Sequence, residues 1–274
     1  MEFTTSTAFA AEMRCQIIKM LTASGSGHPG GSLSATDIIA HLYHTEMHVD
    51  PAEPQMADRD RFVLCKGHAV PALYAALALR GFFPADDLLD LRKYGSKLQG
   101  HPDMKKVPGV DMSTGSLGQG LSAACGMALA GKLNASERYV YAVCGDGEME
   151  EGQVWEAAMF AAHYKLDKLI AFLDMNGLQI DGPTEQVMNV APLDAKWEAF
   201  GWHVQVIDGH DHAAIAAAIA AAKAVEGQPS MIICKTVKGK GVSFMENQVG
   251  WHGVAPKPEQ AEQALAEIAK EASK

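Results

Sequence analysis

Apolar and polar positions divide the chain into segments with distinct periodicities. Apolar side chains recur at intervals of three and four residues over 6–23, which predicts a helix, and the pattern over 34–47 predicts a second one. A short apolar run at 61–65 precedes a third helical stretch at 70–80. The next segment, 95–120, is polar and rich in glycine turns, which predicts a long loop of the kind that usually carries function.

From residue 121 onward, short and nearly continuous apolar runs alternate with helical segments. Such runs are typical of strands in a parallel sheet that is covered on both faces. We therefore expect one α/β domain over 1–274, a parallel sheet flanked by helices on both faces, with a detachable C-terminal helix from about 256. The expected strands are 139–144, 169–174, 203–207 and 230–234, and the expected helices are 121–132, 152–164, 192–200, 212–225 and 258–272.

Composition narrows the possible partners and location of the protein. The chain has 274 residues, of which 48% are hydrophobic, and a net charge of −10, which argues against nucleic acid or an anionic membrane as a partner. The longest uncharged stretch in the middle, 112–131, is too rich in glycine to span a bilayer, and the N-terminus has no pattern of a secretory signal. Five scattered cysteines predict reduced core thiols, and we expect a cytoplasmic protein.

The sharpest local feature is YVYAVC followed by GDGEMEEG, a helix and then LIAFLDMNG. Both strands of a right-handed βαβ unit end at the same sheet edge, so Asp146 and Asn176 are expected to point toward one place. Their side-chain oxygens and the carbonyl oxygen of Leu178 are hard donors that suit Mg²⁺. Gly145 and Gly147 let the backbone approach such a ligand, and the following helix directs N–H groups at an anion. The alternative is an ordinary strand-to-helix turn.

Four of the eleven histidines, His28, His68, His101 and His252, lie in glycine or proline turns. Turns after the carboxyl ends of strands are where α/β proteins place their sites. A neutral imidazole both donates and accepts a hydrogen bond and is protonated near neutral pH, which suits proton transfer to hydroxyls and carbonyls. We expect these four side chains to converge.

The remaining histidine patterns and one glycine pattern have simpler interpretations. His41, His44 and His48 share a helical spacing, which we interpret as a solvated or subunit-facing stripe because no carboxylate completes a metal site. His210 and His212 flank Asp211 before a helix and are interpreted as capping context. A formal GxGxxG, at Gly25, Gly27 and Gly30, follows a predicted helix instead of a strand, which argues against a nicotinamide dinucleotide site.

The GDG and the asparagine 30 residues later resemble the thiamine diphosphate motif. The segments GSGHPGGSLSATDI, CKGHAVPALY, QGHPD, STGSLGQGL and WHG resemble, in the same order, the N-terminal domain of transketolase. The resemblance runs from about residue 10 to about 255. It implies thiamine diphosphate as cofactor, with Mg²⁺ or Ca²⁺ held by Asp146, Asn176 and the Leu178 carbonyl.

The resemblance also implies roles for individual residues. His28, His101 and His252 would line the sugar channel as catalytic residues, and Glu151 would contact the neighbouring cofactor-binding domain. The implied cofactor contacts, from diphosphate to ring system, are His68, Gly115, Ser116, Leu117, Gly145, Asp146, Gly147 and Asn176. Ser116 and Leu178 depart from the usual family pattern, where many members have proline and isoleucine.

The activity that the resemblance implies is the transfer of a two-carbon ketol unit from a ketose phosphate to an aldose phosphate, as in the pentose phosphate pathway. The glutamate that acts on the cofactor's pyrimidine lies, in this family, on a second domain downstream. At 274 residues the chain is too short for a complete transketolase, so we expect a split enzyme, α₂β₂, with a C-terminal, pyrimidine-binding subunit. The alternatives are a subunit like deoxyxylulose phosphate synthase or the 2-oxoacid dehydrogenase first component, and a non-catalytic partner subunit.

Overall fold

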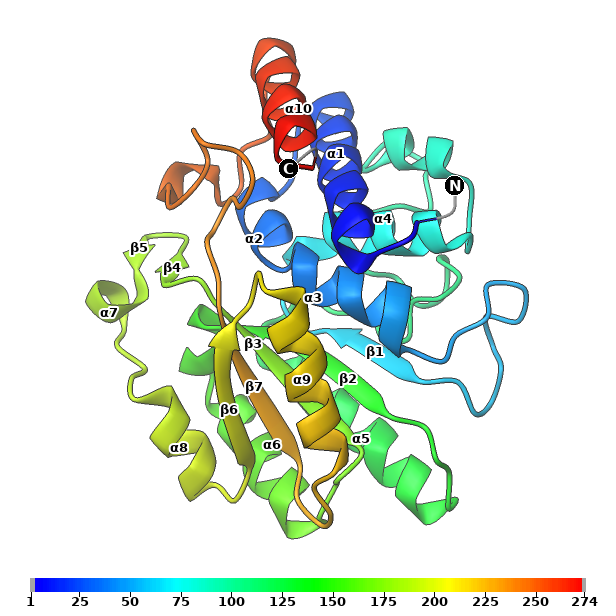
Figure 1. Cartoon of the computed structure of the whole chain (residues 1–274), viewed down its shortest axis with the longest axis vertical. Coiled ribbons are helices and arrows are strands. Elements are labelled where there is room, and N and C mark those ends of the chain that lie inside the picture. Colours follow the sequence, from blue (N-terminus) through cyan, green and yellow to red (C-terminus); the bar gives the residue numbers. More distant parts are fainter. Residues whose placement is uncertain (1–2, 273–274) are drawn as a thin grey trace.

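The computed structural model describes residues 3–272 and is built around a five-stranded parallel sheet (Figure 1). The strand order is β1-β2-β3-β7-β6. All four neighbouring pairs run parallel, so every strand ends at the same edge of the sheet. The expected α/β class is confirmed. The strands are β1 (Arg61–Leu64), β2 (Val140–Gly145), β3 (Leu169–Met175), β6 (His203–Asp208) and β7 (Ser230–Lys235).

Neighbouring residues of a strand point to opposite sides of the sheet. Both faces of this sheet are apolar, and helices cover each of them. Phe62 and Leu64 belong to an apolar cluster with the helices of one face, whereas Val63 belongs to the cluster of the other face. The first face is covered by α1 (Ser6–Ser24), α2 (Pro29–Ser34), α3 (Thr36–His41), α4 (Val70–Arg80) and α9 (His212–Lys223). The second is covered by α5 (Gln119–Leu133), α6 (Gly152–His163) and α8 (Leu193–Ala199).

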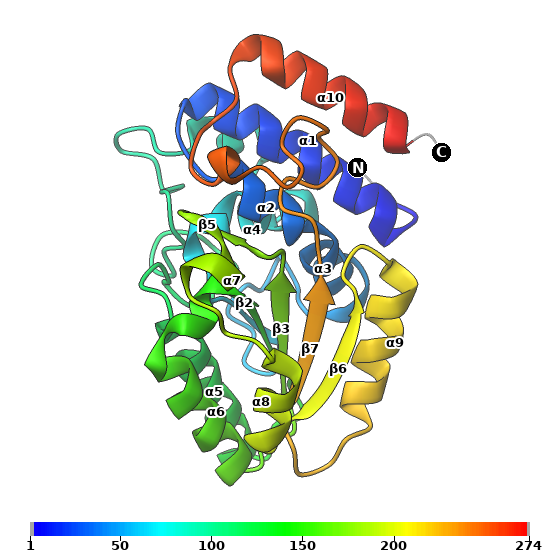
Figure 2. The ribbon, with the colours of Figure 1, turned by 90° about the vertical axis from the view of Figure 1, so that its left-hand side faces the viewer.

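The C-terminal helix α10 (Pro258–Ala272) lies along α1 (Figure 2). Its side chains Ala261, Ala264 and Ile268 are buried and belong to the same apolar cluster as α1 and the sheet. The expectation of a detachable helix is therefore wrong, because its apolar face is covered by the rest of the chain.

The expected helix over 34–47 is largely confirmed, with different bounds: α3 begins at Thr36 and continues into a π-helical turn, Leu42–Glu46, whereas Ser34 is the last residue of α2. Two hydroxyl groups flank the break between α2 and α3. Ser34 Oγ donates to the Asp174 carboxylate, and Thr36 Oγ1 donates to the Ser32 carbonyl. Side chains of this type compete with regular helix hydrogen bonds.

The three histidines of this region are not a solvated stripe. His41 is buried with its ring 6.1 Å from that of His212, and His44 Nε2 bonds the Phe3 carbonyl. Only His48 is exposed, after the π-helical turn has ended. Within residues 3–272 no cluster of three or more histidine, cysteine or acidic side chains could hold a metal ion.

The expected long loop and the expected free cysteines are confirmed, and one pair of short strands was not expected. No helix or strand forms between residues 91 and 118, as the glycine turns predict. All five cysteines are free thiols, and four of them are buried. In the described part of the chain no helix is long and apolar enough to cross a membrane. A hairpin of β4 (Leu178–Gln179) and β5 (Gly182–Pro183), followed by α7 (Thr184–Val187), was not expected.

The long segment before α5 is anchored to the sheet by a buried carboxylate. Asp111 accepts hydrogen bonds from both terminal nitrogens of Arg59, at 3.2 and 2.5 Å, and from the Phe62 N–H at 2.9 Å. The two charged side chains are 5% and 4% exposed. This contact ties the segment to the first strand.

Replacing Asp111 by alanine should lower the free energy of unfolding by about 3–5 kcal/mol, because it leaves the Arg59 guanidinium buried without its counter-charge. The measurement is chemical denaturation followed by circular dichroism. Asp90→Ala is the matched control, since its pair with Lys93 is 57% exposed and is expected to contribute at most about 1 kcal/mol. Equal losses in the two variants would contradict the anchoring role.

Candidate active site

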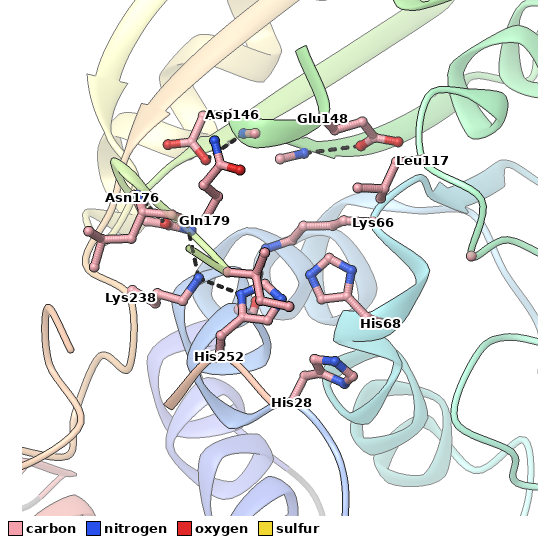
Figure 3. A pocket seen from close by; sticks show the side chains of 16 residues that line it. His28, Lys66, His68, Leu117, Asp146, Glu148, Asn176, Gln179, Lys238 and His252 are labelled. Atoms are coloured by element: carbon pink, nitrogen blue, oxygen red, sulfur yellow. Dashed lines mark hydrogen bonds between the residues drawn. The ribbon is translucent and has the colours of Figure 1, made fainter. Parts of the chain in front are cut away.

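A cavity of about 270 Å³ lies beyond the carboxyl ends of the central strands (Figure 3). Open α/β sheets place their ligands at this edge. The lining residues come from the start of α2, from the loops after β1, β2, β3 and β7, and from the segment before α5. They are His28, Gly31, Lys66, His68, Gly115, Leu117, Gly145, Asp146, Gly147, Glu148, Asn176, Leu178, Gln179, Ile180, Lys238 and His252.

A fully buried carboxylate, Asp174, joins the segments that form the cavity. It lies near the end of β3 and forms an ion pair with Lys66, which follows β1. It also accepts hydrogen bonds from Ser34 Oγ at 2.6 Å, from Thr236 Oγ1 and from Asn176 Nδ2 at 3.3 Å. Burial opposes ionisation of Asp174, but the charge of Lys66 and these hydrogen bonds outweigh it and lower its pKa.

Asp146 and Asn176 lie in neighbouring loops because the register pairs Gly145 with Asp174. Asp146 Oδ2 accepts the Gly177 N–H at 2.5 Å, and Oδ1 accepts the Gly147 N–H at 2.9 Å. No basic side chain within the described residues bonds this carboxylate. Burial, and next the charge of Asp174, raise the pKa of Asp146 to about 6.

The donors around Asp146 fit a hard cation. The Asn176 amide is oriented by its Nδ2, which donates to Asp174, so that its Oδ1 accepts the Leu178 N–H at 3.1 Å. The Leu178 carbonyl is on the same loop and lines the cavity with Asp146. A carboxylate, an amide oxygen and a carbonyl are the ligand types that Mg²⁺ takes, with the remaining positions filled by water or phosphate. A cation would also balance the unpaired charge of Asp146.

Two buried lysines also line the cavity. Lys66 is 3% exposed and, besides its ion pair, donates to the Gly31 carbonyl at 2.8 Å. Lys238 is 2% exposed and contacts the Leu178 carbonyl at 3.1 Å and His252 Nδ1 at 3.0 Å. Burial, and next the charge of Lys66, lower the pKa of Lys238 to about 8. The cavity therefore combines oxygen donors for a cation with ammonium groups for an anion.

Three of the predicted histidines, His28, His68 and His252, meet at the cavity, where their ring centroids are 5.2 to 5.4 Å apart. Burial is the main cause that lowers their pKa values, to about 4, 2 and 4, and neighbouring positive charges add to it. All three are neutral at pH 7 and able to donate and accept hydrogen bonds.

The other predicted residues lie at the border of the cavity or outside it. His101 does not line it, but its ring packs against Gly115, where a Cβ would lie 2.9 Å from His101 Cδ2. Ser116 and Glu151 are exposed and also outside the lining. Glu151 lies at the start of α6 and packs closely against Gly118. A Cβ added to Gly118 would lie 2.8 Å from the Cβ of Glu151.

Sequence reasoning missed several functional positions. Glu148 is buried and accepts hydrogen bonds from the N–H groups of Gly118, at 2.9 Å, and Gly145, at 3.2 Å, so it joins two cavity loops. A carboxylate at the end of the apolar run LIAFLD was a signal for Asp174. Nothing local distinguishes Lys66 or Lys238 from exposed lysines.

The fold and the cavity define an α/β protein with a polar cavity at the carboxyl edge of its sheet, where oxygen donors suited to a cation lie beside ammonium groups suited to an anion. Residues 5–271 match the family described as transketolase, thiamine diphosphate binding domain, and the chain belongs to this family. The resemblance stated from the motifs is therefore confirmed.

Similar proteins include both short subunits and longer enzymes. The chain is 49% identical, over 94% of its length and 96% of the relative, to the 6-deoxy-6-sulfo-D-fructose transketolase subunit SqwG of Clostridium sp. (strain MSTE9). It is 40% identical, over 95% of its length and 92% of the relative, to one subunit of the apulose-4-phosphate transketolase of Phocaeicola vulgatus. The structure of transketolase from Leishmania mexicana matches with a TM-score of 0.92 at 33% identity. The match includes 100% of this chain and 42% of the Leishmania mexicana chain.

The lowered pKa of His28 predicts a pH-dependent stability. Its pKa is about 4 in the folded chain and about 6.5 when unfolded, so the unfolded state binds more protons between these values. The free energy of unfolding should therefore fall as the pH drops from 6.5 to 4. His28→Gln should reduce this slope in urea titrations at a series of pH values, with parallel curves above pH 7. An unchanged slope would contradict the burial of a neutral His28.

Proposed function

We propose that this chain is the N-terminal subunit of a two-subunit, cytoplasmic transketolase, a single diphosphate-binding domain over 1–274 that includes the C-terminal helix from about 256. It transfers a two-carbon ketol unit from a ketose to an aldose when joined by a pyrimidine-binding C-terminal subunit. The observation that carries the proposal is the cavity that combines the oxygen donors around Asp146 with two buried lysines and three neutral histidines.

Thiamine diphosphate, when bound, supplies a nucleophilic carbon and an electron sink for carbon–carbon cleavage. The chain's own oxygens, from Asp146, Asn176 and the Leu178 carbonyl, hold Mg²⁺ or Ca²⁺ beside the diphosphate. The ammonium groups of Lys66 and Lys238 face the same cavity and complement its negative charge. Cofactor contacts complete the set: His68, Gly115, Ser116, Leu117, Gly145, Asp146, Gly147 and Asn176.

The histidines bind and orient the sugar. His28 and His252 are neutral and lie side by side, which lets them donate hydrogen bonds to a carbonyl oxygen and accept them from a hydroxyl. His101, packed against Gly115, extends this set toward the solvent. Glu151 is exposed at the start of α6, as a contact to a neighbouring subunit requires.

The names of two relatives support the proposed partner and substrate class. Both are named as subunits of transketolases and are matched over more than nine-tenths of their length, which supports a second polypeptide. We propose a symmetric α₂β₂ assembly of the two chains. The names of these relatives specify a sulfonated and a phosphorylated sugar. We therefore propose an anionic ketose, a sugar phosphate or a sulfonated analogue, as the donor.

Asp146→Ala should abolish the metal-dependent part of thiamine diphosphate binding, because it removes the charged ligand of the cation. Isothermal titration calorimetry with and without Mg²⁺ measures this. Asp181→Ala is the matched control, since Asp181 is an exposed carboxylate of the adjacent hairpin. Binding by the Asp146 variant that still strengthens on addition of Mg²⁺ would contradict the metal assignment.

Ketol transfer should require the second subunit. The purified chain with thiamine diphosphate and Mg²⁺ is expected to give no turnover of xylulose 5-phosphate with ribose 5-phosphate, or of a sulfonated ketose, and a C-terminal transketolase subunit should restore it. A coupled assay of the released aldehyde measures the rate. Rapid turnover by the chain alone would overturn the split-site proposal.

A further inference from the structure

A second buried ionic cluster lies on the far side of the cavity wall, between α1, α3 and the loop that joins β6 to α9. Asp37 is 4% exposed and is held by both terminal nitrogens of Arg14, at 3.0 and 2.5 Å. His210 Nδ1 is 2.7 Å from Asp37 Oδ2, and His212 Nε2 is 3.3 Å from Asp37 Oδ1. The Asp211 side chain between these histidines caps α9, as expected, but both imidazoles point away from the helix end to Asp37.

His210 extends this cluster to the segment after β7. Its Nε2 accepts the backbone N–H of Val237 at 2.9 Å. Because an amide can only donate, Nε2 carries no proton, and the ring proton of the neutral imidazole is on Nδ1, where it donates to Asp37. Asp37 thus determines both the tautomer and the orientation of His210, in the way that a carboxylate orients a histidine behind a metal site.

The residue after Val237 is Lys238, whose ammonium group lies in the cavity. The segment is held on its other side by the Gly239 N–H, which donates to the Gly30 carbonyl at 3.0 Å. Lys238 Nζ is 3.0 Å from His252 Nδ1 and 3.1 Å from the Leu178 carbonyl. A shift of the backbone at Val237 would therefore move the ammonium group relative to a catalytic histidine and a metal ligand.

We propose that His210, oriented by Asp37, is a positioning residue that holds the 236–240 backbone so that the Lys238 ammonium group faces the cofactor's diphosphate. This inference rests on the proposed function, because it requires an anionic group in the cavity. His212 is the control residue that distinguishes this positioning role from a general contribution to stability. It bonds the same carboxylate but has no hydrogen bond to the 236–240 segment among the described residues.

The test compares four variants of the full-length chain: His210→Phe, His210→Gln, His212→Phe and Lys238→Met. His210→Phe keeps a ring of similar size without either hydrogen bond, and His210→Gln keeps an acceptor for the Val237 N–H. Hydrogen–deuterium exchange of peptides that cover 236–240, measured without cofactor, reports how well the backbone amides of this segment are protected. Calorimetry with thiamine diphosphate and Mg²⁺ reports the affinity, and thermal melts report the global stability.

His210→Phe should speed exchange at 236–240 and weaken thiamine diphosphate binding by about tenfold, the lower end of the usual effect of losing an orienting partner. His210→Gln should keep most of the protection from exchange and most of the affinity. His212→Phe should change neither the exchange at 236–240 nor the affinity, even where its melting temperature falls as far as that of His210→Phe. Wild-type exchange in His210→Phe, or equally fast exchange in His212→Phe, would overturn the positioning role. Unchanged affinity in Lys238→Met would instead contradict the proposed role of Lys238 toward the diphosphate, and the exchange data would still decide the role of His210.

Discussion

The buried ion pair between Lys66 and Asp174 is the constraint on which the candidate active site depends. Lys66 follows β1, Asp174 lies near the end of β3, and the two residues are 108 positions apart in the chain. Removing both charges from water is costly, and replacing such a pair with apolar residues often stabilises a protein. Its value here is geometric, because the same carboxylate bonds Ser34 at the end of α2, Asn176 after β3 and Thr236 after β7. One charged group thus aligns four segments around the cavity.

The two central strands β2 and β3 are apolar until close to their ends, which places these polar groups at the edge of the sheet. β2 is buried along its whole length, and β3 is buried through Asp174, its penultimate residue and the one charged residue in these two strands. The parallel register then brings the residues after β2 and β3 together, and Asp146 reaches the Gly177 N–H. The position of the site is a consequence of where the apolar runs end, which explains why its oxygen donors lie in the loops that follow the strands.

The sequence predicts those parts of the fold and the site that depend on neighbouring residues. Apolar runs are sufficient to identify the strands β2, β3, β6 and β7, and GDG followed by an asparagine places Asp146 and Asn176 on adjacent loops. The sequence did not predict that Ser34 belongs to α2 and bonds a carboxylate 140 positions away, so the helix expected over 34–47 begins only at Thr36. Lys66, Lys238 and the Asp37–His210 pair were missed for the same reason. Their burial depends on partners distant in the chain, and no local pattern shows that a lysine or histidine has one.

The partners of the buried carboxylates also separate structural groups from ligand-binding ones. Asp37, Asp111 and Asp174 each bond a cationic side chain, Arg14, Arg59 and Lys66 respectively, so their charges are balanced within the chain. Asp60, Asp146 and Glu148 accept hydrogen bonds from backbone amides instead, and burial raises the pKa values of Asp146 and Glu148 to about 6 and 7. Asp60 uses one oxygen for the His48 N–H and the other for the Tyr139 N–H, outside the cavity. Glu148 uses both of its oxygens to join two loops, whereas Asp146 lies beside further oxygen donors in an open cavity. Asp146 is therefore the buried carboxylate whose charge is best balanced by a ligand. This local requirement, and not the net charge of −10, determines how an acidic protein can bind a diphosphate.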